Sequence, residues 1–136
     1  MAYWLMKSEP DVYPWERLQR EKRGSWDGVR NHQAAIHLRA MQVGDEAFFY
    51  HSNIGKEIVG IMQVVKTAYP DPSDTTGKFV MVDVAPVQPL ARTVTLAQIK
   101  ADKILQTMVL VRQGRLSVSP VTAIQWRRVL VLSGRV

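Results

Sequence analysis

Three side chains with hydrogen-bonding groups follow directly on the first apolar run of the chain. Trp4–Met6 are typical core residues, and Lys7, Ser8 and Glu9 then supply an ammonium, a hydroxyl and a carboxylate. Such groups suit the binding of a polar ligand, or acid–base chemistry, at the end of a buried strand. This pattern raises the question of which other residues share that end of the fold.

Three further polar clusters follow apolar segments: Trp26–Asn31, Tyr50–Asn53 and Arg112–Ser117. In a small barrel the strand ends converge on one rim, where a few fixed donors and acceptors can surround an apolar hollow. The alternative is that these residues are caps and turns that satisfy local backbone groups. For Asn31 or Ser52 taken alone we favour the alternative, whereas four clusters in one chain favour a shared site.

Trp26 is the most informative single residue, since it lies between Gly24 and Gly28 in a predicted loop. A tryptophan in such a place either covers the core or offers a flat platform on which an aromatic ligand stacks. The sequence leaves both interpretations open.

Motifs for catalysis are largely missing. There is no Gly-x-Ser-x-Gly elbow and no Walker loop. His32 and His37 are five residues apart, which does not align them on one helical face for a metal. Ser8, His51 and Glu9 form a triad only under an assumed geometry. We therefore expect no enzyme, no metal and no cofactor.

Composition narrows the class of protein. The 136 residues suit one domain, 1–136, and 46% hydrophobic with 22% charged residues is ordinary for a folded protein. Cysteine is absent and no signal peptide or membrane span is predicted, so we expect a cytoplasmic monomer with no membrane partner. A net charge of +6 modestly favours a polyanion such as nucleic acid.

Strand-like and helix-like segments are interspersed without regular βαβ alternation. The predicted strands are Tyr3–Lys7, Glu46–Ser52, Glu57–Thr67, Phe79–Val87 and Arg115–Ser119. Helices are predicted from Pro14 to Gly24, after an Asn31 cap, and after the capping boxes that begin at Thr95 and Thr122. Tyr69–Asp74 is predicted to be a loop. This pattern predicts an α+β fold with a mixed, mostly antiparallel, barrel-like sheet decorated by short helices.

The order of the motifs is similar to that of the EVE domain family. The resemblance runs from Tyr3 to about Leu132 and is carried by YWLMKSEP, WDGVRNxQA, RAMxVGDxAFFYHSN, IVGI, AYPDP, MVDV and LVRQGRLSVSPV. It implies a PUA-like fold, kinship with YTH domains, and binding of modified bases in DNA or RNA.

The resemblance also implies which residues form the site. Trp26 matches the tryptophan expected to stack on a flipped-out base, and Lys7 and Ser8 match the Lys-Ser pair that begins the pocket. The expected pocket residues are Lys7, Ser8, Glu9, Trp26, Val29, Asn31, Tyr50, His51, Ser52, Leu116 and Ser117. The expected contacts to phosphate or backbone are Arg30, Arg112 and Arg115.

Two features depart from the family pattern. His32 stands where tyrosine is common, and the loop between Asp71 and Phe79 is short. The leading hypothesis is a reader of modified bases in nucleic acid. The alternatives are an enzyme that acts on a modified nucleobase or nucleoside with Glu9 or His51 as acid and base, and a small-molecule sensor that uses the same pocket.

Overall fold

The computed structural model describes residues 1–134, and its central element is a six-stranded mixed sheet. The strands are arranged in the spatial order β2-β5-β4-β3-β1-β6. Their bounds are β1 Tyr3–Ser8, β2 Gly24–Ser25, β3 Glu46–His51, β4 Glu57–Pro70, β5 Val80–Thr95 and β6 Val118–Val121.

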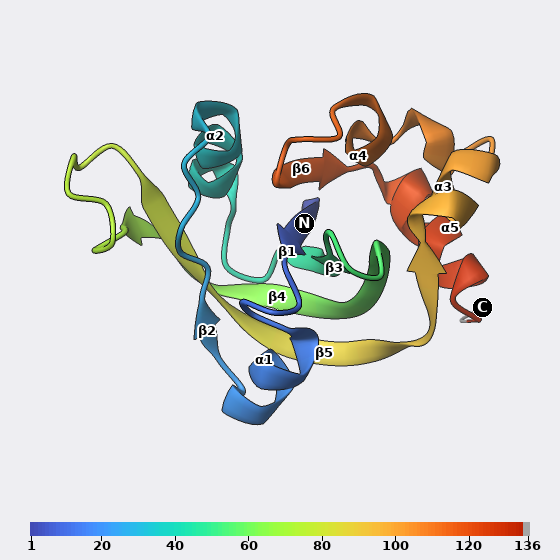
Figure 1. Ribbon diagram of the computed structural model, residues 1–136, viewed down its shortest axis with the longest axis horizontal. Coiled ribbons are helices and arrows are strands. Elements are labelled where there is room, and N and C mark those ends of the chain that lie inside the picture. Colours follow the sequence, from blue (N-terminus) through green and yellow to red (C-terminus); the bar gives the residue numbers. More distant parts are fainter. Residues whose placement is uncertain (135–136) are drawn as a thin grey trace.

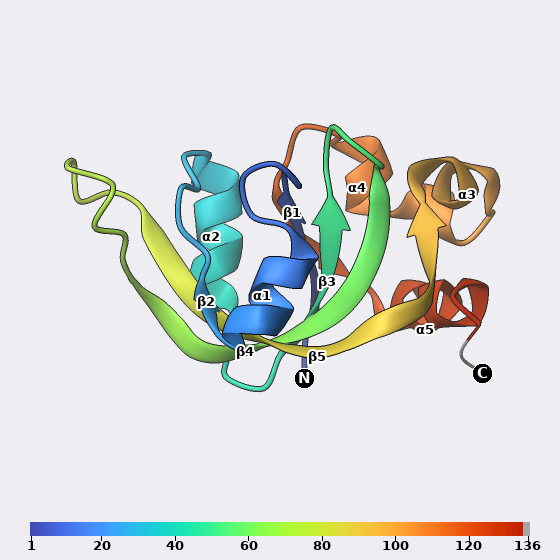
Figure 2. The same ribbon diagram turned by 60° about the horizontal axis from the view of Figure 1, so that its bottom comes forward.

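The sheet is mostly antiparallel, with one parallel pair between β1 and β3. The long strands β4 and β5 curve around the other elements (Figure 1 and Figure 2). Within residues 1–134 the edge strands β2 and β6 do not pair with each other, so the curved sheet stays open. The predicted α+β class and mostly antiparallel sheet are thus confirmed, with curvature in place of barrel closure.

Short helices cover both faces of the sheet. Asn31 caps α2 as predicted, because its side-chain oxygen accepts from the Ala34 N–H at 2.9 Å. Both predicted capping boxes, at Thr95 and Thr122, are present. The helices are α1 Trp15–Glu21, α2 His32–Ala40, α3 Leu96–Ala101, the 3-10 helix η1 Leu105–Thr107, α4 Val109–Arg112 and α5 Ala123–Leu132.

Some predicted boundaries were wrong. The strand predicted at Arg115–Ser119 is β6, which begins three residues later, and β4 extends through Tyr69 and Pro70. β5 contains Pro86 and Pro89, although proline cannot donate to a sheet ladder. It is tolerated because β5 has only the two-residue β2 beside it on its outer edge, paired at Asp83 and Val84.

Alternation along the strands produces two hydrophobic clusters, one on each face. On β1, Trp4 and Met6 enter the first cluster and Leu5 enters the second. The first cluster packs beneath α1 and α2, and the second lies beneath α3, η1 and α5, which Figure 1 shows gathered at the C-terminal side. The end of β1 therefore lies between two separately built halves of the core.

None of the helices found among residues 1–134 combines the length and the apolar character needed to cross a membrane.

Candidate functional site

A pocket of about 770 Å³ opens where β1 leaves the sheet. We call it the Trp26 pocket. Its volume lies within the roughly 300–1,000 Å³ typical of small-molecule sites. The side chains that matter below are Lys7, Ser8, Tyr13, Ser25, Trp26 and Asp83.

Trp26 is placed by the short strand β2. Ser25 pairs with Asp83 of β5, and the Trp26 N–H donates to the Val82 carbonyl at 2.7 Å. The indole lies edge-on against Phe49, with 5.2 Å between ring centroids, and only 6% of the residue is exposed. Trp26 therefore completes the core and also lines the pocket, while the stacking of a ligand on its ring stays a prediction.

The loop after Trp26 is held by a buried carboxylate in the Asp71–Phe79 loop. Asp71 accepts from the Gly28 N–H at 2.8 Å and from the Arg30 guanidinium at 3.1 Å. Hydrogen bonds from Ser73, Gly28 and Arg30 outweigh the effect of burial and lower the pKa of Asp71 to about 2. This loop therefore fixes the Trp26 segment, even though it is short.

Tyr13 is a pocket residue that the sequence analysis missed. Its ring lies edge-on to Trp26 at 6.2 Å and stacks on Phe49 at 6.5 Å. Its hydroxyl lies so close to Gly24 that a Cβ there would approach it to 2.2 Å. Burial, followed by the nearby Glu21 carboxylate, raises the pKa of Tyr13. The only signal in the sequence was an aromatic residue between a strand and Pro14, which also fits an ordinary loop.

Ser8 lines the Trp26 pocket, but its hydroxyl hydrogen is already donated within the protein. The Ser8 hydroxyl donates to the Tyr13 carbonyl at 2.8 Å, which ties the β1–α1 loop to the end of the strand. Because a hydroxyl has two lone pairs, Ser8 can still accept a hydrogen bond from a ligand N–H.

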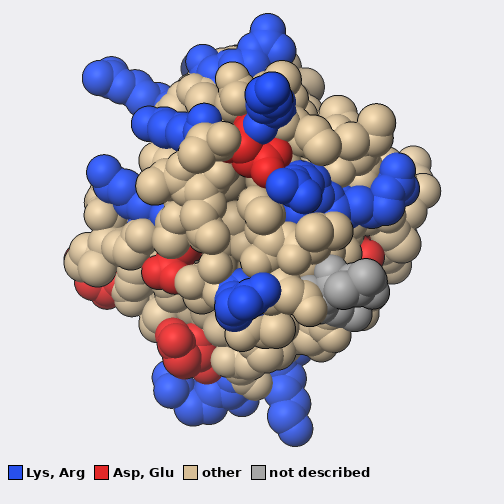
Figure 3. Space-filling view, turned by 90° about the vertical axis from the view of Figure 1, so that its right-hand side faces the viewer, with Lys and Arg blue, Asp and Glu red and all other residues tan. Residues whose placement is uncertain are grey.

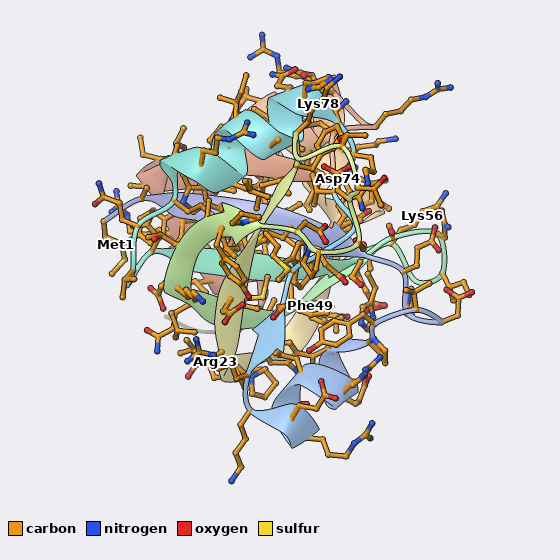
Figure 4. All side chains as sticks on the ribbon, turned by 90° about the vertical axis from the view of Figure 1, so that its left-hand side faces the viewer. Met1, Arg23, Phe49, Lys56, Asp74 and Lys78 are labelled. Carbon is orange, nitrogen blue, oxygen red and sulfur yellow. The ribbon has the colours of Figure 1, made fainter. Side chains whose placement is uncertain are left out.

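Charges in the Trp26 pocket are balanced. Lys7, Arg17 and Arg23 line it together with Glu21, Asp27 and Asp83. Two pairs are bonded, Arg17 with Glu21 at 3.2 Å and Arg23 with Asp83 at 2.9 Å. A wall with paired charges and aromatic faces suits a neutral, flat and polar ligand better than a free anion. Figure 4 shows Phe49 near the middle of this side and Arg23 toward its lower left.

Tyr50 and Ser52 are not in the Trp26 pocket. They line a separate hollow of about 240 Å³, which we call the lysine recess and define by Lys7, Tyr50, Ser52, Asn53, Lys56 and Lys100. Lys7 borders both hollows, because its stem leaves the end of β1 between them while its ammonium donates to the Gly114 carbonyl at 2.6 Å.

A third, shallow hollow brings together Asn31, Leu116 and Arg115. Leu116 also belongs to the first hydrophobic cluster. The expected site residues are therefore distributed over three hollows instead of one.

The remaining expected site residues lie outside these hollows. Val29 is buried in the first cluster, the Ser117 carbonyl accepts from the Lys7 N–H at 2.9 Å, and Arg112 is exposed at the end of α4. Arg30 is bonded to Asp71 and Ser73 and lies over the Phe79 ring, so much of its hydrogen-bonding capacity is used within the protein.

Ser8, Glu9 and His51 do not form a triad. Ser8 donates to Tyr13, Glu9 accepts from the Asn53 amide at 2.7 Å, and His51 accepts from the Trp15 N–H at 3.1 Å. Burial lowers the pKa of His51, which keeps its Nε2 free to accept. Each of the three groups thus has a structural partner of its own.

The described part of the chain has no group of three or more His, Cys, Asp or Glu residues that could hold a metal ion.

An open curved sheet flanked by short helices, with a pocket at the end of its first strand, agrees with the expected PUA-like fold. The model of the EVE domain matches residues 2–132, and the chain belongs to this family. Human thymocyte nuclear protein 1 is 39% identical over an alignment that covers 96% of this chain and 73% of the relative.

Solved structures agree with this assignment. A protein from Rhodopseudomonas palustris is 51% identical with a TM-score of 0.93, covering 98% of this chain and 94% of that one. The human THYN1 protein in complex with DNA that contains 5-methylcytosine is 39% identical with a TM-score of 0.90, covering 100% and 99%.

A more distant likeness concerns the fold alone. A YTH domain from Zygosaccharomyces rouxii, solved with N6-methyladenosine RNA, is 13% identical with a TM-score of 0.59 and covers 97% of this chain and 86% of that one.

Proposed function

We propose that this protein reads modified bases in nucleic acid by holding one flipped-out base in the Trp26 pocket. The observation that carries the proposal is that the Trp26 indole and Ser8 line one pocket of about 770 Å³. The human relative solved with 5-methylcytosine DNA supports DNA as the polymer and a modified cytosine as the first base to test.

Stacking on Trp26 alone does not supply enough free energy to hold a flipped-out base. Extruding a paired base costs a few kcal/mol, and one stacking contact returns about 1–3 kcal/mol. Because only 6% of Trp26 is exposed, full stacking also requires that Tyr13 move from its edge-on position. Net affinity must therefore come from hydrogen bonds at the base edge and from phosphate contacts.

The walls offer acceptors for such an edge. Ser8 and Asp27 line the pocket, and each carries an oxygen that can accept a hydrogen bond. Asp83 also lines it, but both of its carboxylate oxygens already accept from Arg23, Ser25 and Tyr69. An amino or imino N–H of a base can donate to these oxygens. Burying one methyl carbon contributes about 0.8 kcal/mol, close to a fourfold preference.

The test is a titration of matched oligonucleotides at one salt concentration. DNA and RNA strands with and without 5-methylcytosine are titrated into the wild type and into Trp26→Phe, with anisotropy of a labelled strand as the signal. We expect a preference of about fourfold for the methylated strand and loss of that preference in the variant. Equal affinity for modified and plain strands in the wild type would contradict the proposal.

An enzyme with this pocket is disfavoured, because Ser8, Glu9 and His51 are each bonded to other groups. Incubation of the protein with modified nucleosides and oligonucleotides, followed by mass spectrometry, tests this directly. Turnover that Glu9→Gln abolishes would replace the reader with an enzyme.

A further inference from the structure

The lysine recess is lined by three lysines and, among residues 1–134, by no acidic residue. Lys7, Lys56 and Lys100 come from β1, the β3–β4 connection and α3, and no aspartate or glutamate lines this hollow among residues 1–134. Like charges gathered around a hollow repel one another, and an anion between them removes that repulsion.

Tyr50 adds a donor that has no partner. Only 3% of the residue is exposed, and its hydroxyl makes no side-chain hydrogen bond among residues 1–134. The hydroxyl is not one of the fully buried unpaired polar atoms there, which are Trp15 Nε1, His37 Nε2 and Ser119 Oγ, so it reaches the surface of the hollow. Burial raises the pKa of Tyr50 to about 12, so the hydroxyl keeps its proton and can donate to a bound anion. A register shift in the β3–β4 pairing falls between Phe49 and Tyr50, and such shifts redirect side chains near functional sites.

The connection that carries Lys56 is held in a particular shape. Asn53, Gly55 and Lys56 all have positive φ, at 65°, 88° and 47°. For asparagine and lysine this conformation is costly unless the surroundings impose it. The Leu96 N–H donates to the Lys56 carbonyl at 2.8 Å, and the Asn53 amide donates to Glu9. Figure 4 shows Lys56 on the side of the molecule opposite Arg23.

The size of the recess restricts its occupant. Its volume of about 240 Å³ is below the roughly 300–1,000 Å³ of pockets that hold whole small molecules. It fits a single compact group that carries more than one negative charge and several acceptor oxygens, which describes a phosphate.

We infer that the lysine recess is a second binding site, which takes one phosphate group next to the Trp26 pocket. The phosphate belongs either to the backbone of a nucleic acid or to a free phosphate ester. The two hollows meet at Lys7, which borders both of them. The inference stands on the recess alone and does not require that a base enter the Trp26 pocket.

The first arm of the test uses inorganic phosphate at constant ionic strength. We expect saturable NMR shifts at the amides of Tyr50, Lys56 and Lys100, and about tenfold weaker binding in Lys56→Ala/Lys100→Ala. Tyr50→Phe weakens binding without unfolding the protein, because the hydroxyl that it removes has no partner. The matched control is Lys103→Ala/Arg127→Ala, which removes the same charge from exposed positions outside the recess and leaves phosphate binding unchanged.

The second arm identifies the source of the phosphate. If it is the nucleic-acid backbone, the slope of log affinity against log salt for a DNA oligonucleotide falls by about one in the double lysine variant, because one phosphate contact is lost. An unchanged slope together with weakened phosphate binding identifies a free phosphate ester, which a nucleoside monophosphate titration then checks.

Two results would overturn the inference: phosphate shifts that do not saturate, or equal weakening in the control variant. Failure of the base-reading proposal would give a different result in the same titrations. In that case the preference for methylated strands is absent, while phosphate still binds the wild type and Trp26→Phe equally.

Discussion

The two hollows on either side of Lys7 are built in opposite ways. In the Trp26 pocket most wall residues belong to the hydrophobic core or to bonded networks, and four of the six charged side chains are paired. In the lysine recess Lys56 and Lys100 are exposed side chains that form no ion pair within residues 1–134, and Tyr50 lines the hollow beside them. The wall of the first hollow therefore cannot be changed without affecting the folded state, whereas in the second hollow charge can be changed at little structural cost.

The largest expected effect is that of Trp26→Ala. Removing a buried indole that packs on Phe49 should lower the free energy of unfolding by about 3–5 kcal/mol. Urea denaturation followed by circular dichroism measures the loss. A decrease below about 1 kcal/mol would mean that Trp26 covers a pocket without supporting the core, and would break the comparison.

The second largest loss of stability is expected for Asp71→Ala. It leaves the Gly28 N–H and the Arg30 guanidinium without their acceptor and should cost about 1–3 kcal/mol. Because the folded-state pKa of Asp71 is lowered to about 2, its contribution is present above pH 3.8 and is lost as the pH falls through 2.

The pH dependence provides the check on Asp71. Denaturation curves from pH 5 to pH 2 should be flatter for Asp71→Ala than for the wild type. Parallel curves would show that another carboxylate, such as Asp74 or Asp83, whose pKa values are also lowered by hydrogen bonds, accounts for the acid sensitivity.

Gly24→Ala should have a smaller effect, confined to one hollow. The new methyl group would meet the Tyr13 hydroxyl, so the half-buried ring must swing outward, at a cost of about 1–2 kcal/mol. Oligonucleotide binding should change while phosphate binding in the lysine recess stays as in the wild type. NMR shifts of Tyr13 and Tyr50 distinguish the two hollows, and a shifted Tyr50 would argue against their independence.

The smallest expected effect is that of Lys56→Ala/Lys100→Ala on stability. Both side chains are exposed, so the free energy of unfolding should stay within about 0.5 kcal/mol of the wild type or rise slightly as repulsion is relieved. Thermal denaturation measures this. A clear loss of stability would show that these lysines support the fold. The two hollows would then no longer differ in how much their walls contribute to stability.

Much of the fold follows from local rules. The Asn31 cap and the boxes at Thr95 and Thr122 depend on side chains that bond to a backbone group three residues away, so the sequence is sufficient to predict them. The two-residue strand β2 has no such local signal, since it exists only because Gly24 and Ser25 meet β5 some sixty positions later.

The candidate site was less predictable for the same reason. Lys7, Ser8 and Trp26 share a pocket, but alternation along β3 sends Tyr50 to the opposite face from Phe49, which separates it from Trp26. That alternation was visible in the sequence, whereas the approach of Tyr13 to Gly24 depends on how the β1–α1 loop folds back.

The face formed by α3 and α5 also carries basic side chains. Figure 3 shows several lysine and arginine side chains toward the upper edge of this face, with an acidic patch among them, and others at its lower edge. A polyanion that reaches the lysine recess therefore meets additional positive charge at longer range, which raises the rate of association more than the lifetime of the complex.

One side chain at the boundary has a thermodynamic consequence. Lys7 is half-buried, burial lowers its pKa, and it lines both hollows. If two ligands were bound together, each would lie near the same positive charge, and linkage requires that any coupling free energy between them be equal in both directions. The end of a six-residue strand is thus the place at which such coupling would be measured, by titrating phosphate with and without a bound oligonucleotide.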